Sequence, residues 1–164
     1  MMGLKRIVAI CLWLSLGAAL SYFTWLGAHK SYVLLIPAYF TVGLSILCHG
    51  FSTAFVVALL LPVLDYMALR SFDLPLMLMH TLELAIFALF LSLLFHRTGI
   101  RKSIFFAFSL SWWVSRFVQY NVLNSWELRE ILVFLVGLLS NMLLLPEVKR
   151  LLVKLGETER RSCG

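Results

Sequence analysis

Long apolar segments alternate with short polar segments along the whole chain. The apolar segments cover residues 7–27, 32–48, 51–69, 74–95, 103–122 and 130–146. A helix needs about 20 mostly apolar residues to cross the hydrocarbon core of a bilayer, and most of these segments come close to that length. The pattern therefore predicts an all-α integral membrane protein, in which residues 1–164 form a single bundle of about six transmembrane helices.

The second and third segments form one continuous apolar stretch from Tyr32 to Leu69. As a single helix it would be about 57 Å long at 1.5 Å per residue, far longer than one crossing requires. We expect the chain to turn at Cys48-His49-Gly50, because glycine tolerates turn conformations. The other polar breaks are a turn from Arg70 to Asp73, a basic loop from His96 to Lys102, a connection from Asn124 to Glu130, and a charged tail over 147–164.

Composition supports a membrane location. Hydrophobic residues make up 62% of the chain and charged residues 13%, with a mean hydropathy of +0.95. Soluble domains are about half apolar and one quarter charged, so a soluble core in a chain of this length could not bury so much apolar surface. The cysteines Cys11, Cys48 and Cys163 are too widely spaced for a metal-ligand motif or a disulfide framework. The sequence thus predicts no metal site and no cofactor.

The distribution of Lys and Arg predicts the orientation of the chain. Short cytoplasmic loops carry an excess of these residues. With both termini in the cytoplasm, ten basic residues lie on the inner side and three, Lys30, Arg70 and Arg129, on the outer side. This asymmetry favours an even number of spans. The net charge of +6 then reflects topology, and we expect no nucleic-acid partner because the basic residues are divided among separate loops.

Ionisable and amide side chains inside a membrane are costly and mark candidate functional sites. Within the expected spans these residues are Asp65, His80, Glu83, Arg116, Gln119 and Asn141. Asp65, Glu83 and Arg116 all fall in the outer half of their spans, so three helices can converge on one polar site that opens outward.

Helical spacing groups other residues with these charges. His80 lies three residues before Glu83, and Gln119 lies three residues after Arg116, so each pair shares one helix face. Trp112, Arg116 and Tyr120 are spaced by four. We expect Trp112 and Tyr120 to form aromatic walls of the site, with Tyr66 or Trp126 as a further wall.

Simpler interpretations of these residues stay open. Glu83 and Arg116 at equal depth can neutralise each other as a structural pair, which does not exclude a cavity beside them. His80 can be an interfacial histidine, and Asn141 can hold helices together within the bundle. No catalytic residue is expected, because the sequence has no Gly-x-Ser-x-Gly, His-Glu-x-x-His or phosphate-binding glycine motif.

Three groups of short motifs lie between about Leu35 and Leu155: Leu59 to Tyr66 followed by Leu74-Pro75-Leu76 and Leu82 to Phe87, then Ser115-Arg116, and then Gly137 to Asn141. In these motifs the chain resembles the substrate-binding S components of energy-coupling factor (ECF) transporters. The first group is similar to their third and fourth helices, Ser115-Arg116 resembles the Gly-Arg pair of their fifth helix, and Gly137 to Asn141 resembles their sixth. The Ala-x-x-x-Ala ridge on the first helix, by which many members dock, is reduced here to Ser15 and Ala19.

The resemblance implies a multi-pass protein of a prokaryotic cell membrane. Such a protein captures a vitamin or similar small organic nutrient from outside, together with a transmembrane coupling subunit and two cytoplasmic ATPase subunits. Two other functions remain open. One is a membrane scaffold of the rod-shape-determining D type, in which the polar residues only pack helices. The other is a small ion-coupled carrier that uses Asp65 or Glu83 as its proton site.

Overall fold

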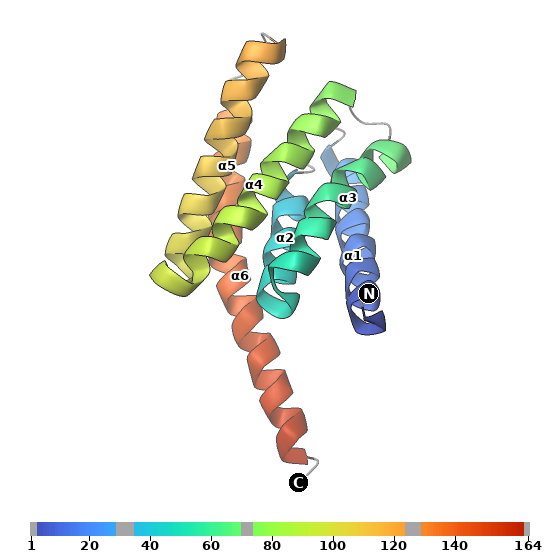
Figure 1. The fold of residues 1–164 in the computed structure, drawn as a ribbon, viewed down its shortest axis with the longest axis vertical. Coiled ribbons are helices and arrows are strands. Elements are labelled where there is room, and N and C mark those ends of the chain that lie inside the picture. The colour runs from blue at the N-terminus through green and yellow to red at the C-terminus, as the bar shows by residue number, and fades with distance from the viewer. Residues whose placement is uncertain (1–2, 29–34, 70–73, 124–128, 163–164) are drawn as a thin grey trace.

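The computed structural model describes residues 3–28, 35–69, 74–123 and 129–162. All secondary structure in these ranges is helical, and the expected all-α bundle is confirmed (Figure 1). The expected turn at 70–73 and residues 124–128 of the expected connection from Asn124 to Glu130, with Trp126 among them, lie outside the described residues. The last two residues of that connection are already helical, because the sixth helix begins at Arg129. The six helices are α1 (Leu4–Ala28), α2 (Leu35–His49), α3 (Phe51–Leu69), α4 (Leu74–Thr98), α5 (Ile100–Leu123) and α6 (Arg129–Ser162).

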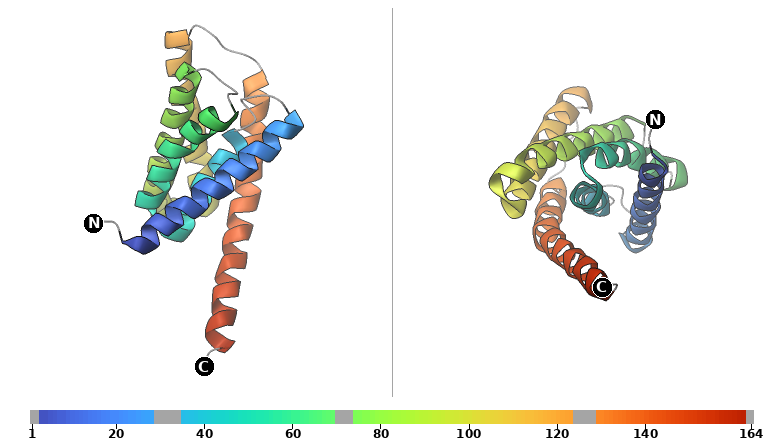
Figure 2. Two further views of the ribbon diagram at one scale, coloured as in Figure 1. Left: turned by 90° about the vertical axis from the view of Figure 1, so that its right-hand side faces the viewer. Right: turned by 60° about the horizontal axis from the view of Figure 1, so that its bottom comes forward.

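The helices run alternately up and down, so both ends of the chain lie at the same end of the bundle (Figures 1 and 2). Helix α2 occupies the centre, as the view along the bundle shows (Figure 2, right). It contacts α1, α3, α4 and α6. Residues Thr41 to Ile46 of α2 are all buried, which explains how a helix of only 15 residues is kept in a bundle of longer ones.

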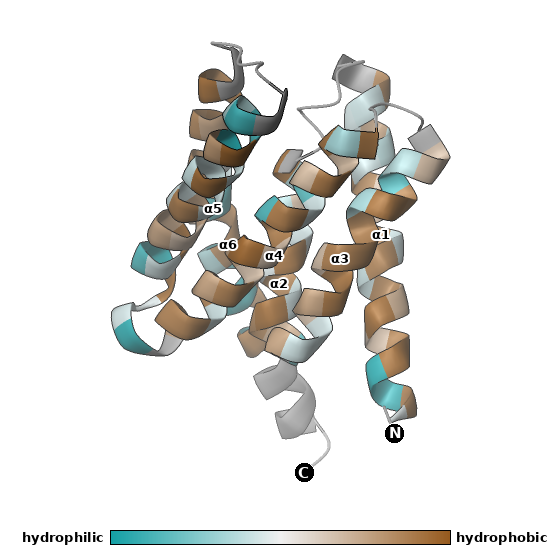
Figure 3. Cartoon of the chain, turned by 45° about the horizontal axis from the view of Figure 1, so that its top comes forward, coloured by the Kyte–Doolittle hydropathy of each residue, from teal (hydrophilic) through white to brown (hydrophobic). Residues whose placement is uncertain are grey.

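Four helices contain segments long and apolar enough to cross a membrane, namely Leu4–Leu26, Phe51–Ala68, Leu74–Phe95 and Ile131–Lys154. The remaining two helices differ from them for separate reasons: α2 is apolar but short, and α5 carries serines, Arg116 and Gln119 on its buried side. Many large apolar side chains on the outside of the bundle are exposed, and most of the helical ribbon carries the colour of apolar residues (Figure 3). The chain is therefore a multi-pass membrane protein.

Two glycines make the tight connections at the end that carries the termini. Gly50 separates α2 from α3 with a φ of 78°, and Gly99 separates α4 from α5 with a φ of 80°. These values lie in the left-handed region, which glycine adopts without steric cost at the end of a helix. The sequence analysis expects a basic loop from His96 to Lys102. In the structure, helix continues on both sides of Gly99, so this loop is reduced to one residue.

Helix α6 extends well past the point where the sequence analysis ends the sixth span. It continues through Pro146 to Ser162, and its last turns project beyond the other helices (Figure 1). An interior proline costs a helix about 3 kcal/mol. Here Pro146 and the preceding Leu145 are buried, and Leu145 packs directly against Gly43 of α2. Packing at Leu145 and Pro146 thus supports a continuous helix where sequence alone predicts a tail.

Candidate functional site

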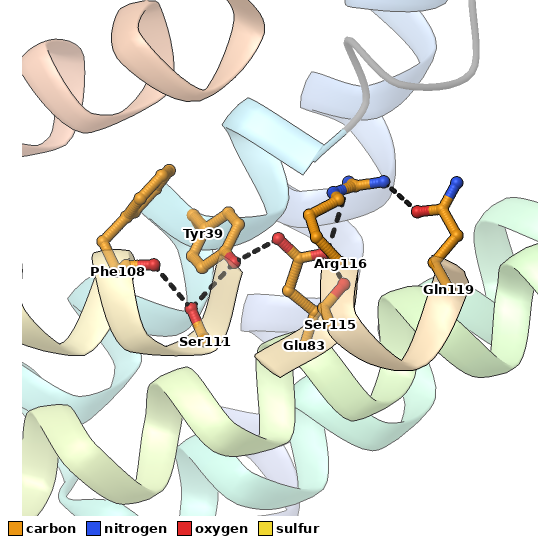
Figure 4. Close-up of polar contacts among 7 residues, drawn as sticks. All are labelled: Tyr39, Glu83, Phe108, Ser111, Ser115, Arg116 and Gln119. Atoms are coloured by element: carbon orange, nitrogen blue, oxygen red, sulfur yellow. Dashed lines mark hydrogen bonds and ion pairs between the residues drawn. The ribbon is translucent and has the colours of Figure 1, made fainter. Parts of the chain in front are cut away.

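The buried carboxylate of Glu83 on α4 is the centre of a polar network that joins three helices (Figure 4). Its Oε1 accepts a hydrogen bond of 2.6 Å from the Tyr39 hydroxyl of α2, and its Oε2 accepts one of 2.9 Å from the Ser115 hydroxyl of α5. Arg116 Nη2 lies 3.7 Å from the same Oε2. A charged group without solvent contact requires such partners, and Glu83 has them on both oxygens.

Tyr39 connects this network to the apolar core. Its hydroxyl also lies 2.9 Å from the Ser111 hydroxyl of α5, which in turn donates to the Phe108 carbonyl at 2.9 Å. The Tyr39 ring packs against Phe87 and Phe108, with centroid distances of 4.7 and 4.1 Å. The tyrosine therefore fixes α2 against α4 and α5 by both aromatic packing and hydrogen bonding.

Arg116 lies at the outer edge of the network. Its Nη1 donates to Gln119 Oε1, and its guanidinium carbon lies 5.9 Å from the centroid of the Trp112 ring. Gln119 and Trp112 are buried. The arginine is thus held between a carboxylate, an amide oxygen and an aromatic face, three groups that all favour a positive charge.

A cavity of about 460 Å³ lies between α5 and the start of α6, and Arg116 forms part of its wall. The other lining side chains are mostly aromatic or aliphatic: Trp112, Trp113, Phe117, Tyr120, Ile131, Phe134 and Leu135. Trp112 packs on Phe134 at a centroid distance of 4.6 Å, whereas Tyr120 is 62% exposed. Three of the residues that the sequence singled out, Trp112, Arg116 and Tyr120, therefore border one cavity.

The other candidate residues lie apart from this cavity wall. Asp65 of α3 is buried and accepts a 3.0 Å hydrogen bond from Ser21 of α1. Tyr66 is half-buried and packs in a small apolar cluster around Met77. His80 is buried one turn before Glu83 on α4. The third helix that joins the network of Glu83 and Arg116 is α2, through Tyr39, whereas the sequence analysis expected α3, through Asp65.

Asn141 is buried in α6, and its amide nitrogen donates to the Gly137 carbonyl of the same helix at 2.8 Å. Its Oδ1 is buried and has no hydrogen-bond partner among the described residues. A desolvated amide oxygen without a donor is costly. In the part of the chain that the structure describes, no group of three or more His, Cys, Asp or Glu side chains is arranged to hold a metal ion.

The geometry of Glu83 limits the chemistry of the site. Its two oxygens are occupied by donors, so it is placed to orient Arg116 and stabilise its charge. Among the described residues that line the cavity, Arg116 is the charged one. No protein-family model, curated protein or solved structure matches this chain significantly. The function therefore has to be inferred from this geometry.

The sequence analysis missed Tyr39 and Ser111 as members of the site, and it singled out Ser115 only through the family resemblance. The sequence does hold one signal for the serines. Ser111, Ser115 and Gln119 are spaced by four and therefore form a polar stripe along one face of the helix. This stripe lies next to the line formed by Trp112, Arg116 and Tyr120. Tyr39 gave no such signal, because it lies in a continuous apolar segment. Only the position of α2 at the centre of the bundle brings its hydroxyl to Glu83.

Proposed function

We propose that this chain is the membrane-embedded substrate-binding subunit of an importer, of the S-component type found in ECF transporters. It would capture a vitamin or similar small organic nutrient from outside a prokaryotic cell. A transmembrane coupling subunit and two cytoplasmic ATPase subunits would complete the transporter and supply its energy. We propose no enzymatic activity for the chain itself.

The single observation that carries this proposal is the cavity between α5 and α6. Its volume of about 460 Å³ falls within the range of small-molecule sites, about 300–1,000 Å³. Aromatic side chains form most of the wall that the described residues provide, and the Arg116 guanidinium is the charged group among them. Such a lining suits a ligand with a flat or apolar body and one anionic group, because guanidinium forms charge-assisted hydrogen bonds with carboxylate and phosphate.

The location of the cavity also supports an importer. It lies near the end of α5 and the start of α6, at the end of the bundle opposite the termini (Figure 1). If the basic residues face the cytoplasm, as the positive-inside rule predicts, this end faces outward. A ligand would then enter from outside the cell beside Tyr120 and Phe117, which are both exposed.

The test is to purify the chain in mild detergent from its native host and identify what accompanies it. We expect a coupling subunit with two ATPases, and one small molecule detectable by mass spectrometry after denaturation. A Trp112→Ala/Tyr120→Ala variant should lose the small molecule. Tyr22→Ala should keep it, because it removes an exposed aromatic residue on α1 that does not line the cavity.

A membrane scaffold of the rod-shape-determining D type is the second candidate. The observation that favours it is the saturation of Glu83, since a carboxylate with donors on both oxygens serves helix packing without any ligand. The same purification separates the two functions. Recovery of cell-wall elongation proteins, with no small molecule and no ATPases, would contradict the importer and support the scaffold.

A further inference from the structure

A groove of about 740 Å³, separate from the cavity beside Arg116, lies where the turn between α4 and α5 meets α6. It is at the end of the bundle that carries both termini (Figure 1), opposite the cavity beside Arg116. None of the described residues that line it is acidic, and five are basic, namely Arg101, Lys102, Lys149, Arg150 and Lys154. This basic groove is independent of the importer proposal.

The basic groove begins at the depth where the apolar part of the bundle ends. The Lys149 ammonium lies 4.4 Å from the centroid of the Phe95 ring, and Phe95 is the last residue of the apolar segment Leu74–Phe95. A lysine at this position places its stem along the hydrocarbon and its charge at the membrane surface. The groove is therefore at the level of lipid headgroups.

The start of α5 adds to the positive potential of the groove. The α5 helix begins directly after Gly99 and has no acidic residue in its first turn. Its first N–H groups lack partners within the helix and form the positive end of the helix dipole. The Ser103 hydroxyl donates to the Gly99 carbonyl at 2.7 Å and lies 3.0 Å from the Thr98 hydroxyl, which holds this turn in place.

Among the side chains that the structure describes, one nearby acidic residue reduces the charge in part. Glu147 lies 2.7 Å from Arg150 and pairs with it. Arg101, Lys102 and Lys149 also line the groove, and Arg101 and Lys102 are exposed. One turn further along α5, Phe105 and Phe106 are exposed on the outer surface. The region thus combines a basic groove with adjoining apolar surface suited to acyl chains.

We infer that the basic groove binds the phosphate-bearing headgroup of an anionic phospholipid. The charge of the lining matches a phosphate, the depth matches a headgroup, and the apolar surface beside it distinguishes a lipid from free phosphate. A bound lipid would join the α4–α5 turn to the projecting part of α6.

Native mass spectrometry of the purified chain tests this inference. The probes are dioleoyl phosphatidylglycerol, dioleoyl phosphatidylcholine with the same acyl chains, and inorganic phosphate. The wild-type chain should retain phosphatidylglycerol in preference to phosphatidylcholine, and inorganic phosphate should not displace it. Each basic residue near an anionic lipid contributes about fivefold in affinity, so Arg101→Gln/Lys102→Gln/Lys149→Gln should bind phosphatidylglycerol about a hundredfold more weakly.

The matched control is Lys5→Gln/Arg6→Gln/Arg97→Gln, which removes three charges near the same end without touching the groove. It should bind phosphatidylglycerol within about threefold of wild type, less than the effect of one such residue. An equal loss in the control, equal binding of phosphatidylcholine, or displacement by inorganic phosphate would overturn the inference. Circular dichroism verifies folding. If the triple variant does not fold, Arg101→Gln/Lys102→Gln changes only exposed side chains and should weaken binding about twentyfold.

Discussion

The pair of Glu83 and Arg116 allows a quantitative prediction through a double-mutant cycle. The single changes are Glu83→Gln and Arg116→Gln, which remove one charge each and keep side chains that can form hydrogen bonds. The two charged groups are 3.7 Å apart, and their side chains are 0% and 9% exposed. At the effective dielectric constant of about 20 that describes most protein sites, charges at this distance attract by about 4 kcal/mol.

The cost of each change differs because the two groups are buried to different degrees. Arg116→Gln leaves the fully buried carboxylate of Glu83 without its cationic partner, although the Tyr39 and Ser115 hydroxyls still donate to it. We expect a loss of about 3–5 kcal/mol in the free energy of unfolding. Glu83→Gln leaves the slightly exposed arginine beside Gln119 and Trp112 and should cost less. The double variant should be more stable than Arg116→Gln, with a coupling energy of at least about 2 kcal/mol.

The assay is equilibrium unfolding in mixed micelles with increasing sodium dodecyl sulfate, followed by circular dichroism. Glu147 and Arg150 provide a matched control, because they form an ion pair of the same chemistry at 2.7 Å with exposed side chains. Their coupling energy should be below about 1 kcal/mol. A coupling energy for Glu83 and Arg116 no larger than that of the control pair would refute the reasoning that burial gives this pair its strength.

Two further predictions concern packing, and a third concerns the orientation of the chain. A Cβ on Gly43 would lie 2.7 Å from Leu145 Cδ1, so Gly43→Val should destabilise the bundle by about 1–3 kcal/mol. In a Leu145→Ala background, Gly43→Val should cost less in the same unfolding assay. Equal stability of Gly43→Val and wild type would contradict the close contact. Asn141→Leu should be neutral or stabilising by up to about 1 kcal/mol, because it removes a buried oxygen without a donor; a large loss of stability would mean that this oxygen has a partner. In a cysteine-free background, an impermeant thiol reagent added to intact cells should label Asn121→Cys but not Ser52→Cys, both at exposed positions, and the reverse result would invert the orientation.

Sequence alone determined the class of the protein because the cost of exposing backbone to hydrocarbon leaves few options. Apolar segments of this length must form helices in a membrane, and an all-α bundle follows. The rare polar residues within those segments could also be identified from sequence. Glu83, Arg116 and Gln119 stand out among apolar neighbours, and all three lie in one network in the structure.

The tertiary structure alone decided which helix each polar residue meets. In a membrane bundle the side facing lipid and the side facing other helices are both apolar, so periodicity does not reveal the packing face of α3 or α4. Tyr39 therefore belongs to the site without any signal in the sequence, and Asp65 accepts a hydrogen bond from Ser21 on α1 instead of contacting the site.

The course of α6 was decided in the same way. A proline followed by charged residues is a local sequence signal for the end of a helix. The helix continues through Pro146 where Leu145 is buried against Gly43 of α2, a contact between segments about one hundred residues apart. Such tertiary contacts stabilise a helix independently of its local sequence, so only the assembled bundle shows that the helix does not end at the proline.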